Sequence, residues 1–325
     1  MAPRFAPLLL VPALLLGGCA ASPVVSQTSS PETPDFPLTL DNCGVEVTLA
    51  AAPERVVTIK STSTEMMLAL GVGDRIVGTA YQDGPVPEEW TDAASGIPSL
   101  APKMPNEESV LELEPDLVYA GWESAFSADA AGERAELASL GVASYVQPAA
   151  CQSAEQPTKL DFDEVFREIE EAGAIFGVPD AAAELVAEQR AQLAGIEAAS
   201  GSPTALWWSS GTDTPYVGAG IGAPELLLET AGFANIAADV DATWSPLGWE
   251  AIIATDPDVL VLVDSDWNSA QKKMDYLASN PATAAMTAVQ QQRYIVVPFA
   301  ASEAGVRSVE AAASIAEQWR ELEAR

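Results

Sequence analysis

Two segments of the chain repeat one pattern, and this repeat constrains the fold more than any other feature. Residues 108–119 read ESVLELEPDLVY, and residues 250–261 read EAIIATDPDVLV. In each, a short helical segment precedes an acid–proline–aspartate sequence and an apolar run typical of a buried strand. Strands alternate with helical segments around both copies, which predicts an α/β fold with two small lobes built on parallel sheets.

Between the two copies, the sequence predicts one long helix over residues 179–201. Pro179 suits a first helical position. Side chains that can form one packing stripe recur near helical spacing at Leu185, Gln189, Leu193 and Ile196. An ordinary crossover helix within a single sheet is the alternative, and the flanking repeat favours a rigid spacer between an N-terminal lobe (38–178) and a C-terminal lobe (202–325). Ligands of parallel α/β lobes bind at the carboxyl ends of the strands, so a ligand cleft is expected between the lobes.

The N-terminus has the pattern of an export signal over residues 1–19. Arg4 precedes an apolar run, too short to span a bilayer as a helix, that ends in Leu-Gly-Gly-Cys19. This ending resembles the bacterial lipoprotein signal, in which the cysteine is lipidated and becomes the mature N-terminus; a secretory signal cleaved elsewhere is the alternative. Residues 20–37 are rich in Pro, Ser and Thr and predict a flexible tether.

Charge and composition exclude several classes of function. A formal net charge of -32 and a pI near 4.1 disfavour binding to nucleic acid or directly to anionic lipid headgroups. The chain contains no histidine, so His-based catalytic triads and the usual zinc ligands are absent. We therefore expect a binding protein rather than an enzyme, with no catalytic residues, no metal site and no resident cofactor.

Two cysteines remain after Cys19, at positions 43 and 151. In an exported protein an isolated pair is most simply a disulfide, here Cys43 with Cys151. Two buried free thiols are the alternative. The chain has no C-x-x-C motif, so redox chemistry is not expected.

Aromatic and basic residues at predicted strand ends are candidate ligand contacts. For each aromatic residue, core packing is the alternative. Together they suit a flat conjugated ligand, and the aromatic candidates are Tyr81, Trp122, Trp207, Trp208, Tyr216, Trp244, Trp267 and Phe299. Basic residues are scarce, so Lys60 with the adjacent Ser61, and Arg307 after the last strand, are candidates for an anionic ligand group. For each basic residue a local ion pair with a neighbouring acid is the alternative, and for Lys103, also a candidate, that alternative is favoured.

Over residues 38–322 the chain resembles the substrate-binding lipoproteins of bacterial ABC importers, of the type that carries iron-siderophores and cobalamin. The resemblance rests on an ordered set of short motifs at residues 55–65, 114–118, 140–142, 218–236, 249–258 and 293–297. It implies two Rossmann-like lobes joined by one long helix, a lipid anchor on the extracytoplasmic face of the cell membrane, and delivery of a small molecule to an ABC permease dimer. A ligand-sensing lipoprotein or an extracytoplasmic enzyme on the same scaffold is the alternative.

Within that family the amino-acid sequence is most similar to that of an actinobacterial subgroup presumed to bind a precursor of the deazaflavin coenzyme. The similar segments are residues 57–62, 119–124, 206–211 and 216–224. The family resemblance also implies one acidic residue on each lobe that pairs with permease arginines. Glu65 and Glu250 each begin a predicted helix and match those motifs, although such acids are also favoured there by the helix dipole alone. They are the predicted permease-docking residues.

Overall fold

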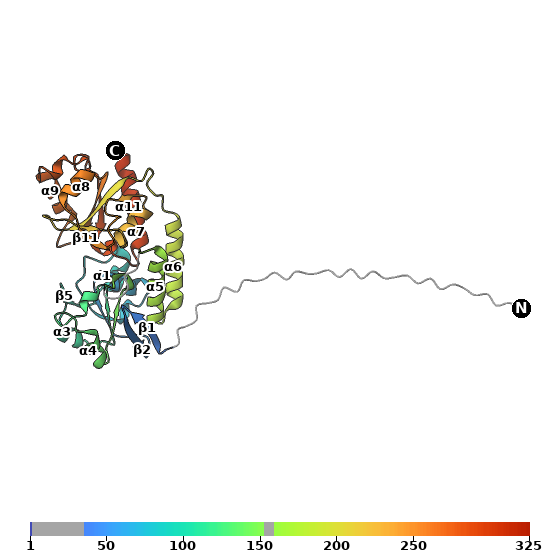
Figure 1. Cartoon of the computed structure of the whole chain (residues 1–325). Helices are drawn as coiled ribbons and strands as arrows, with labels where there is room; N and C mark the ends of the chain where they lie inside the picture. The colour runs from blue at the N-terminus through green and yellow to red at the C-terminus, as the bar shows by residue number, and fades with distance from the viewer. Residues whose placement is uncertain (2–35, 153–158) are drawn as a thin grey trace. The chain divides into compact units, whose positions relative to one another are not determined.

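A computed structural model describes residues 1, 36–152 and 159–325. Of the two units into which the chain divides, the second, Pro31–Arg325, contains every helix and strand of the described residues (Figure 1). The fold given below is that of this second unit. It is an α/β fold with two lobes, as the alternation of strands and helices predicts.

The predicted export signal lies outside the described residues, apart from Met1. The same holds for the lipidation site Cys19 and for nearly all of the predicted tether over residues 20–37. Within the part of the chain that is described, no helix combines the length and the hydropathy needed to cross a bilayer.

The N-terminal lobe is built on a five-stranded parallel sheet in the order β5-β4-β3-β6-β7. Its strands are β3 (Val56–Ile59), β4 (Ile76–Ala80), β5 (Ser99–Ala101), β6 (Leu117–Ala120) and β7 (Ala143–Val146). Its crossover helices include α1 (Ser61–Ala69), α3 (Glu107–Leu111) and α4 (Arg134–Ser139). Every residue of β3 and β6 is buried, because a parallel sheet has both faces covered.

The C-terminal lobe has a six-stranded sheet in the order β11-β9-β8-β12-β13, with β10 also paired to β8. Its strands are β8 (Thr204–Ser210), β9 (Tyr216–Gly218), β10 (Ala234–Asn235), β11 (Trp244–Pro246), β12 (Val259–Asp264) and β13 (Tyr294–Pro298). Its helices include α7 (Ala223–Thr230), α8 (Trp249–Thr255), α9 (Ala270–Ser279) and α11 (Ser308–Glu323).

The sheet of the C-terminal lobe is mixed: the predicted parallel arrangement holds for β8, β10, β12 and β13 but not for β9 and β11. Strand β9 pairs antiparallel with both β8 and β11. Residues 211–215 make a short turn between β8 and β9, and only antiparallel neighbours can be joined by so short a connection. Gly211 has a φ of 76°, and a Cβ there would lie 2.3 Å from the carbonyl oxygen of Thr214, so the turn requires glycine.

The connecting helix α6 spans Pro179–Ala194, so it is shorter than the predicted 179–201. Gly195 caps its C-terminus, and the helix ends there because glycine weakens helix propagation. Figure 1 shows α6 beside α5 (Phe162–Ile175) and linking the two lobes. It packs on α5 of the N-terminal lobe and on α11 of the C-terminal lobe.

The buried face of α6 differs in detail from the predicted stripe. Ala182, Val186 and Gln189 are buried, whereas Leu185 and Leu193 are only partly buried against the core. The side-chain amide of Gln189 donates to the carbonyl oxygen of Val306 over 2.7 Å. Since position 306 belongs to the loop before α11, this bond ties the spacer directly to the C-terminal lobe.

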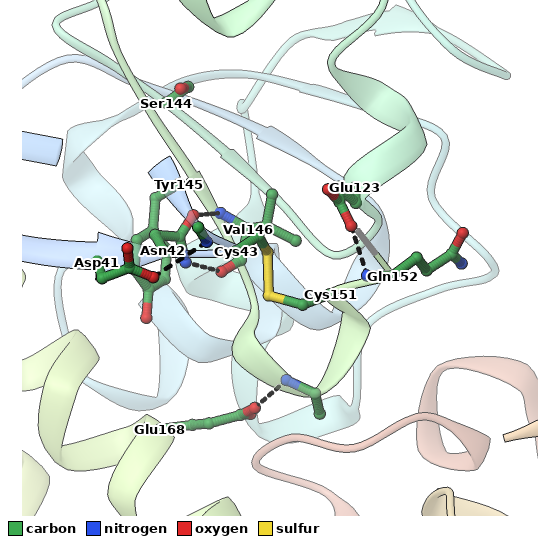
Figure 2. The surroundings of a disulfide bond; sticks show 12 residues. Asp41, Asn42, Cys43, Glu123, Ser144, Tyr145, Val146, Cys151, Gln152 and Glu168 are labelled. Atoms are coloured by element: carbon green, nitrogen blue, oxygen red, sulfur yellow. Dashed lines mark hydrogen bonds between the residues drawn. A yellow bond between two sulfur atoms is a disulfide. The ribbon is translucent and has the colours of Figure 1, made fainter. Parts of the chain in front are cut away.

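A disulfide joins the N-terminal hairpin to the end of the first sheet (Figure 2). The hairpin consists of β1 (Leu38–Asn42) and β2 (Val45–Leu49). Cys43 at its turn is bonded to Cys151, 108 residues further along, with 5.3 Å between the Cα atoms. The disulfide expected from the sequence is therefore present, and closing a loop of this length contributes about 4–5 kcal/mol in the chain-entropy treatment.

Polar contacts around the disulfide align the hairpin with β7 (Figure 2). The Asn42 amide donates to the carbonyl oxygen of Val146 over 2.7 Å, and its Oδ1 accepts from the Val146 N–H over 2.8 Å. Arg134 also donates to Asn42 Oδ1 over 2.9 Å. The hairpin is thus held as an addition to the first lobe.

Candidate ligand-binding cleft

A cleft of about 830 Å³ lies between the lobes, and residues of both lobes line it. In the N-terminal lobe its walls come from the loops that follow β4, β6 and β7, and in the C-terminal lobe from those that follow β12 and β13. The cleft therefore lies at the carboxyl ends of parallel strands, where α/β folds bind ligands. Its volume falls in the range of small-molecule sites, about 300–1,000 Å³.

Six of the eight predicted aromatic residues line this cleft: Tyr81, Trp122, Tyr216, Trp244, Trp267 and Phe299. On the C-terminal lobe, Tyr216 and Trp244 come from adjacent strands and stack with 6.1 Å between ring centroids and 14° between planes. Trp267 packs edge-on against Phe299 at 5.5 Å. Tyr216 is 43% exposed and Trp267 is 51% exposed, so both present apolar ring surface that a bound molecule can cover.

Trp207 and Trp208 do not reach the cleft, and their prediction as ligand contacts is wrong. Both belong to β8, the middle strand of the sheet order, and they are 0% and 1% exposed. Trp207 packs in the large apolar cluster shared by both lobes, and Trp208 packs edge-on against Trp249 at 5.1 Å. Strand β8 is covered on both faces, so alternation along the strand directs each indole into protein.

Lys60 lies directly beneath the floor of the cleft and is fully buried. Its ammonium group pairs with Asp83, whose side chain is 1% exposed. The same Nζ atom lies 3.9 Å from the ring centroid of Trp122, 4.4 Å from that of Tyr81 and 4.6 Å from that of Phe299. Cation–π attraction to three rings and one short ion pair thus hold the charge within the protein.

The backbone at Lys60 supports this arrangement at a cost in free energy. Its φ of 80° and ψ of 151° fall in a region that residues with a Cβ rarely adopt. Such strain costs about 1–3 kcal/mol and persists where the surroundings impose it, often at functional sites. The predicted role of Lys60 in binding an anionic ligand is wrong for this structure, because Asp83 already neutralises the ammonium.

Ser61 also faces inward and does not line the cleft. It is 2% exposed, and its hydroxyl accepts from the N–H of Asp83 over 2.8 Å. Its own N–H donates to the Asp83 carboxylate over 3.4 Å. The predicted ligand contact is therefore replaced by a structural role in holding the Lys60–Asp83 pair.

Glu303 is a residue of the cleft wall that the sequence analysis did not identify. It follows β13, and its Oε1 accepts from the indole N–H of Trp122 in the other lobe over 2.5 Å. Burial raises the pKa of Glu303 to about 7, although the nearby Lys60 ammonium opposes the shift. The only available signal was its place after the last strand, which it shares with many residues that have no role.

Arg307 and Glu65 pair with each other across the lobes, with 3.7 Å from Nη1 to Oε1. The Arg307 side chain is 12% exposed and that of Glu65 only 2%. Arg307 also contacts Glu310, and it does not line the cleft. Its predicted role in binding an anionic ligand is therefore wrong. Glu65 is too deeply buried to meet another protein, so its predicted docking role is wrong as well.

Lowering the pH from about 8 to about 5 is expected to stabilise this protein. Burial raises the pKa of Glu65 to about 7, against the attraction of Arg307, and raises the pKa values of Glu303 and Glu168 to about 7 and about 8. Glutamates in an unfolded chain titrate near 4.3. Between these values the folded protein binds more protons than the unfolded chain, so its stability rises as the pH falls.

Melting temperatures measured at intervals from about pH 8 to about pH 5 test this expectation. Glu65→Gln removes one of the titrating groups, so its melting temperature should change less with pH than that of the natural protein. All other titrating groups are the same in the two proteins. The difference between their slopes of melting temperature against pH therefore reports the contribution of Glu65. A natural protein whose melting temperature falls over this pH range contradicts the expectation.

The charged side chains that line the cleft are predominantly acidic. Among the described residues they are Asp83, Asp266, Glu303 and Lys103, and Lys103 is exposed. No group of three or more potential metal ligands from Cys, Asp and Glu gathers anywhere in residues 36–152 and 159–325. The cleft is thus an aromatic binding site with polar groups at its floor.

Comparison with known proteins places this two-lobed α/β architecture in a family. A model of the periplasmic binding protein family matches residues 56–301. A Bacillus subtilis protein described as an uncharacterized ABC transporter substrate-binding lipoprotein, YvrC, is 28% identical over 95% of this chain and 94% of its own length. A cobalamin-binding protein of Halobacterium salinarum is 31% identical over 79% of this chain and 68% of its own length.

Solved structures agree with this assignment. A Saccharomonospora viridis protein described as an ABC-type Fe3+-hydroxamate transport system superimposes with a TM-score of 0.76 and 32% identity, over 88% of this chain and 99% of its own. A periplasmic binding protein from Veillonella parvula gives the same TM-score with 28% identity, over 86% and 96% of the two chains. The chain belongs to the periplasmic binding protein family.

Proposed function

We propose that this protein captures a small molecule outside the cell and delivers it to the permease of an ABC importer. The observation that carries this proposal is the cleft between two α/β lobes, walled by six aromatic side chains. A site of that form binds a compound by burial and stacking. Among the described residues no constellation of nucleophile and base accompanies it, and the relatives compared above are described as binding or transport proteins rather than enzymes.

The N-terminal sequence supports attachment to the outer face of the cell membrane. Cys19 ends a segment with the features of a lipoprotein signal, and the tether after it has a composition that cannot form a core. The YvrC relative is described as a lipoprotein. A lipid anchor at Cys19 would keep the binding protein close to its permease.

The proposed cargo is a cofactor-like or siderophore-like molecule with a conjugated or chelated core. Relatives are described as binding cobalamin or as part of Fe3+-hydroxamate transport, and a precursor of the deazaflavin coenzyme is the candidate from the sequence motifs. Any iron would arrive already chelated, since the chain has no histidine and the described residues hold no cluster of three or more Cys, Asp or Glu ligands.

Glu108 and Glu250 are the proposed permease-docking residues. They occupy the same position in the two copies of the repeat, and each lies in the first turn of a short helix, α3 or α8. Both are exposed, and in the view of Figure 1 both helices lie away from α6. One exposed acid on each lobe suits pairing with arginines on the two halves of a permease dimer.

Uptake and identification of the cargo test the proposed function together. The protein is purified from its own host, and the absorbance, fluorescence and mass of the compound that co-purifies are recorded. Deleting either this gene or the gene of the permease is then expected to abolish cellular accumulation of that compound. Undiminished accumulation in both strains would contradict import and favour sensing, and chemical conversion of the compound by the purified protein would indicate an enzyme.

A further inference from the structure

Three side chains that line the cleft each keep a buried polar atom without a hydrogen-bond partner among the described residues. These atoms are Thr62 Oγ1, Gln147 Nε2 and Glu303 Oε2. Thr62 and Gln147 are 4% and 2% exposed. Buried polar groups in native proteins nearly always have partners, so three such atoms in the wall of one cavity point to a partner that enters it.

The three atoms belong to one region of the floor, where the two lobes meet. A Cβ at Gly121, the residue after β6, would lie 2.3 Å from Thr62 Oγ1 and 3.3 Å from Gln147 Oε1. A Cβ at Gly305 would lie 3.6 Å from Gln147 Nε2. The Gln147 amide therefore reaches from the first lobe to the loop of the second lobe that carries Glu303. Thr62 Oγ1 therefore packs directly against the backbone of Gly121, and a side chain at position 121 would displace the Thr62 hydroxyl from this place.

The chemistry of these atoms defines what can bind them. The Gln147 amide nitrogen donates, the Glu303 carboxylate oxygen accepts when ionised, and the Thr62 hydroxyl can do either. A molecule bound here must offer at least one N–H or O–H donor and at least one acceptor on neighbouring atoms. An apolar edge would leave all three groups unpaired and would bind poorly for that reason.

The charges around the floor disfavour an anionic group. The Lys60 ammonium is neutralised by Asp83, and Arg307 is paired with Glu65 and Glu310. Among the described residues of the cleft lining, the remaining cation is Lys103, in the loop after β5, and Asp266 and Glu303 are both acidic. An anion bound in the cleft would thus meet more carboxylates than unpaired cations.

We infer that the cargo is a planar, uncharged ring system that presents adjoining hydrogen-bond donor and acceptor groups to Glu303, Gln147 and Thr62. Its ring lies against Tyr216 and Trp267, the two cleft aromatics that remain exposed. This inference rests on the proposed function, and it replaces the anionic ligand predicted from the basic residues. It favours neutral heterocyclic amides over carboxylate-bearing or phosphorylated compounds.

Binding of defined probes to the purified protein tests whether the cleft prefers planar, uncharged ring systems. The probes are riboflavin, which is planar and uncharged and carries an N–H beside carbonyl groups; flavin mononucleotide, which adds a phosphate; hemin, which carries carboxylates; cyanocobalamin; and the iron hydroxamate ferrichrome. Quenching of tryptophan fluorescence reports occupancy of the cleft. Riboflavin is expected to bind in a saturable manner, with an affinity at least about tenfold higher than that of flavin mononucleotide or hemin.

Two isosteric variants test the floor directly. Thr62→Val and Glu303→Gln are each expected to weaken riboflavin binding by at least about tenfold, whereas Glu321→Gln, at an exposed site on α11, should leave it unchanged. Thr62→Val removes an unpaired hydroxyl, so the melting temperature of the unliganded variant should not fall. Loss of binding without loss of stability separates a ligand contact from a structural role.

Several results would overturn the inference. One is equal or tighter binding of flavin mononucleotide or hemin, and another is the absence of riboflavin binding. Unchanged affinity in both variants would mean that only internal water pairs these atoms. Saturable binding of cyanocobalamin or ferrichrome without riboflavin binding refutes the inference and leaves the proposed import function intact. That function fails only if the deletion strains keep their uptake.

Discussion

Replacing both Glu108 and Glu250 by alanine should abolish transport by the importer while leaving ligand affinity unchanged. Both carboxylates are exposed and occupy equivalent positions on the two lobes. Neither lines the cleft, so ligand binding has no reason to change. Removing one partner from a desolvated charge pair at an interface costs about 2–5 kcal/mol, and the double variant loses two such pairs.

Cellular uptake and the Kd of the purified protein are measured side by side for this test. The matched control is Glu184→Ala combined with Glu188→Ala, which removes the same charge from exposed positions on α6. The control should transport normally. If the Glu108/Glu250 variant still supports uptake, the docking assignment is refuted, and if its affinity falls in parallel, the loss of uptake has another cause.

Lys60→Ala should lower the free energy of unfolding by about 3–5 kcal/mol, because it leaves the Asp83 carboxylate buried without its cation. The three aromatic rings around the ammonium would lose the group that they surround. Alanine keeps a Cβ at the strained φ of 80°, so no relief of backbone strain offsets the loss.

Urea denaturation monitored by circular dichroism measures this change. Lys60→Ala combined with Asp83→Ala should recover a large part of the lost stability, because the variant no longer buries an unpaired charge. Lys272→Ala, at an exposed position of α9, serves as the control and should change stability by less than about 0.5 kcal/mol. A Lys60→Ala variant as stable as this control would show that the buried pair does not stabilise the fold.

The proposed docking residues were only partly predictable from the sequence. The repeat aligns Glu108 with Glu250, so the pairing was already visible in the pattern of residues. The motif match instead favoured Glu65, which was expected to begin a helix but lies in the second turn of α1. Solvent exposure distinguishes Glu65 from Glu108 as a docking residue, since Glu65 is 1% exposed and Glu108 lies on the surface. The burial of Glu65 depends on what packs over it, which here includes Arg307 from the distant end of the chain.

The aromatic residues predicted to contact the ligand were also only partly predictable from the sequence. Chain order was enough to bring Tyr81, Trp122, Trp267 and Phe299 to the cleft, because each lies in a loop that follows a parallel strand. Trp207 and Trp208 lie within a strand rather than after it. A strand covered on both faces buries every side chain regardless of alternation, and no local pattern distinguishes such a strand from one that borders a cavity.

The sequence by itself determined the two α/β lobes, the spacer helix between them and the cysteine pair. These follow from periodicity, composition and the repeat, which are properties of neighbouring residues. The tertiary structure alone decided the contacts at the cleft floor. Lys60 and Asp83 are 23 residues apart, and Trp122 and Glu303 are 181 apart. A charged side chain can bind a ligand only if folding does not bring it an ion-pair partner. That partner can lie far away in the sequence, so local sequence patterns do not predict it.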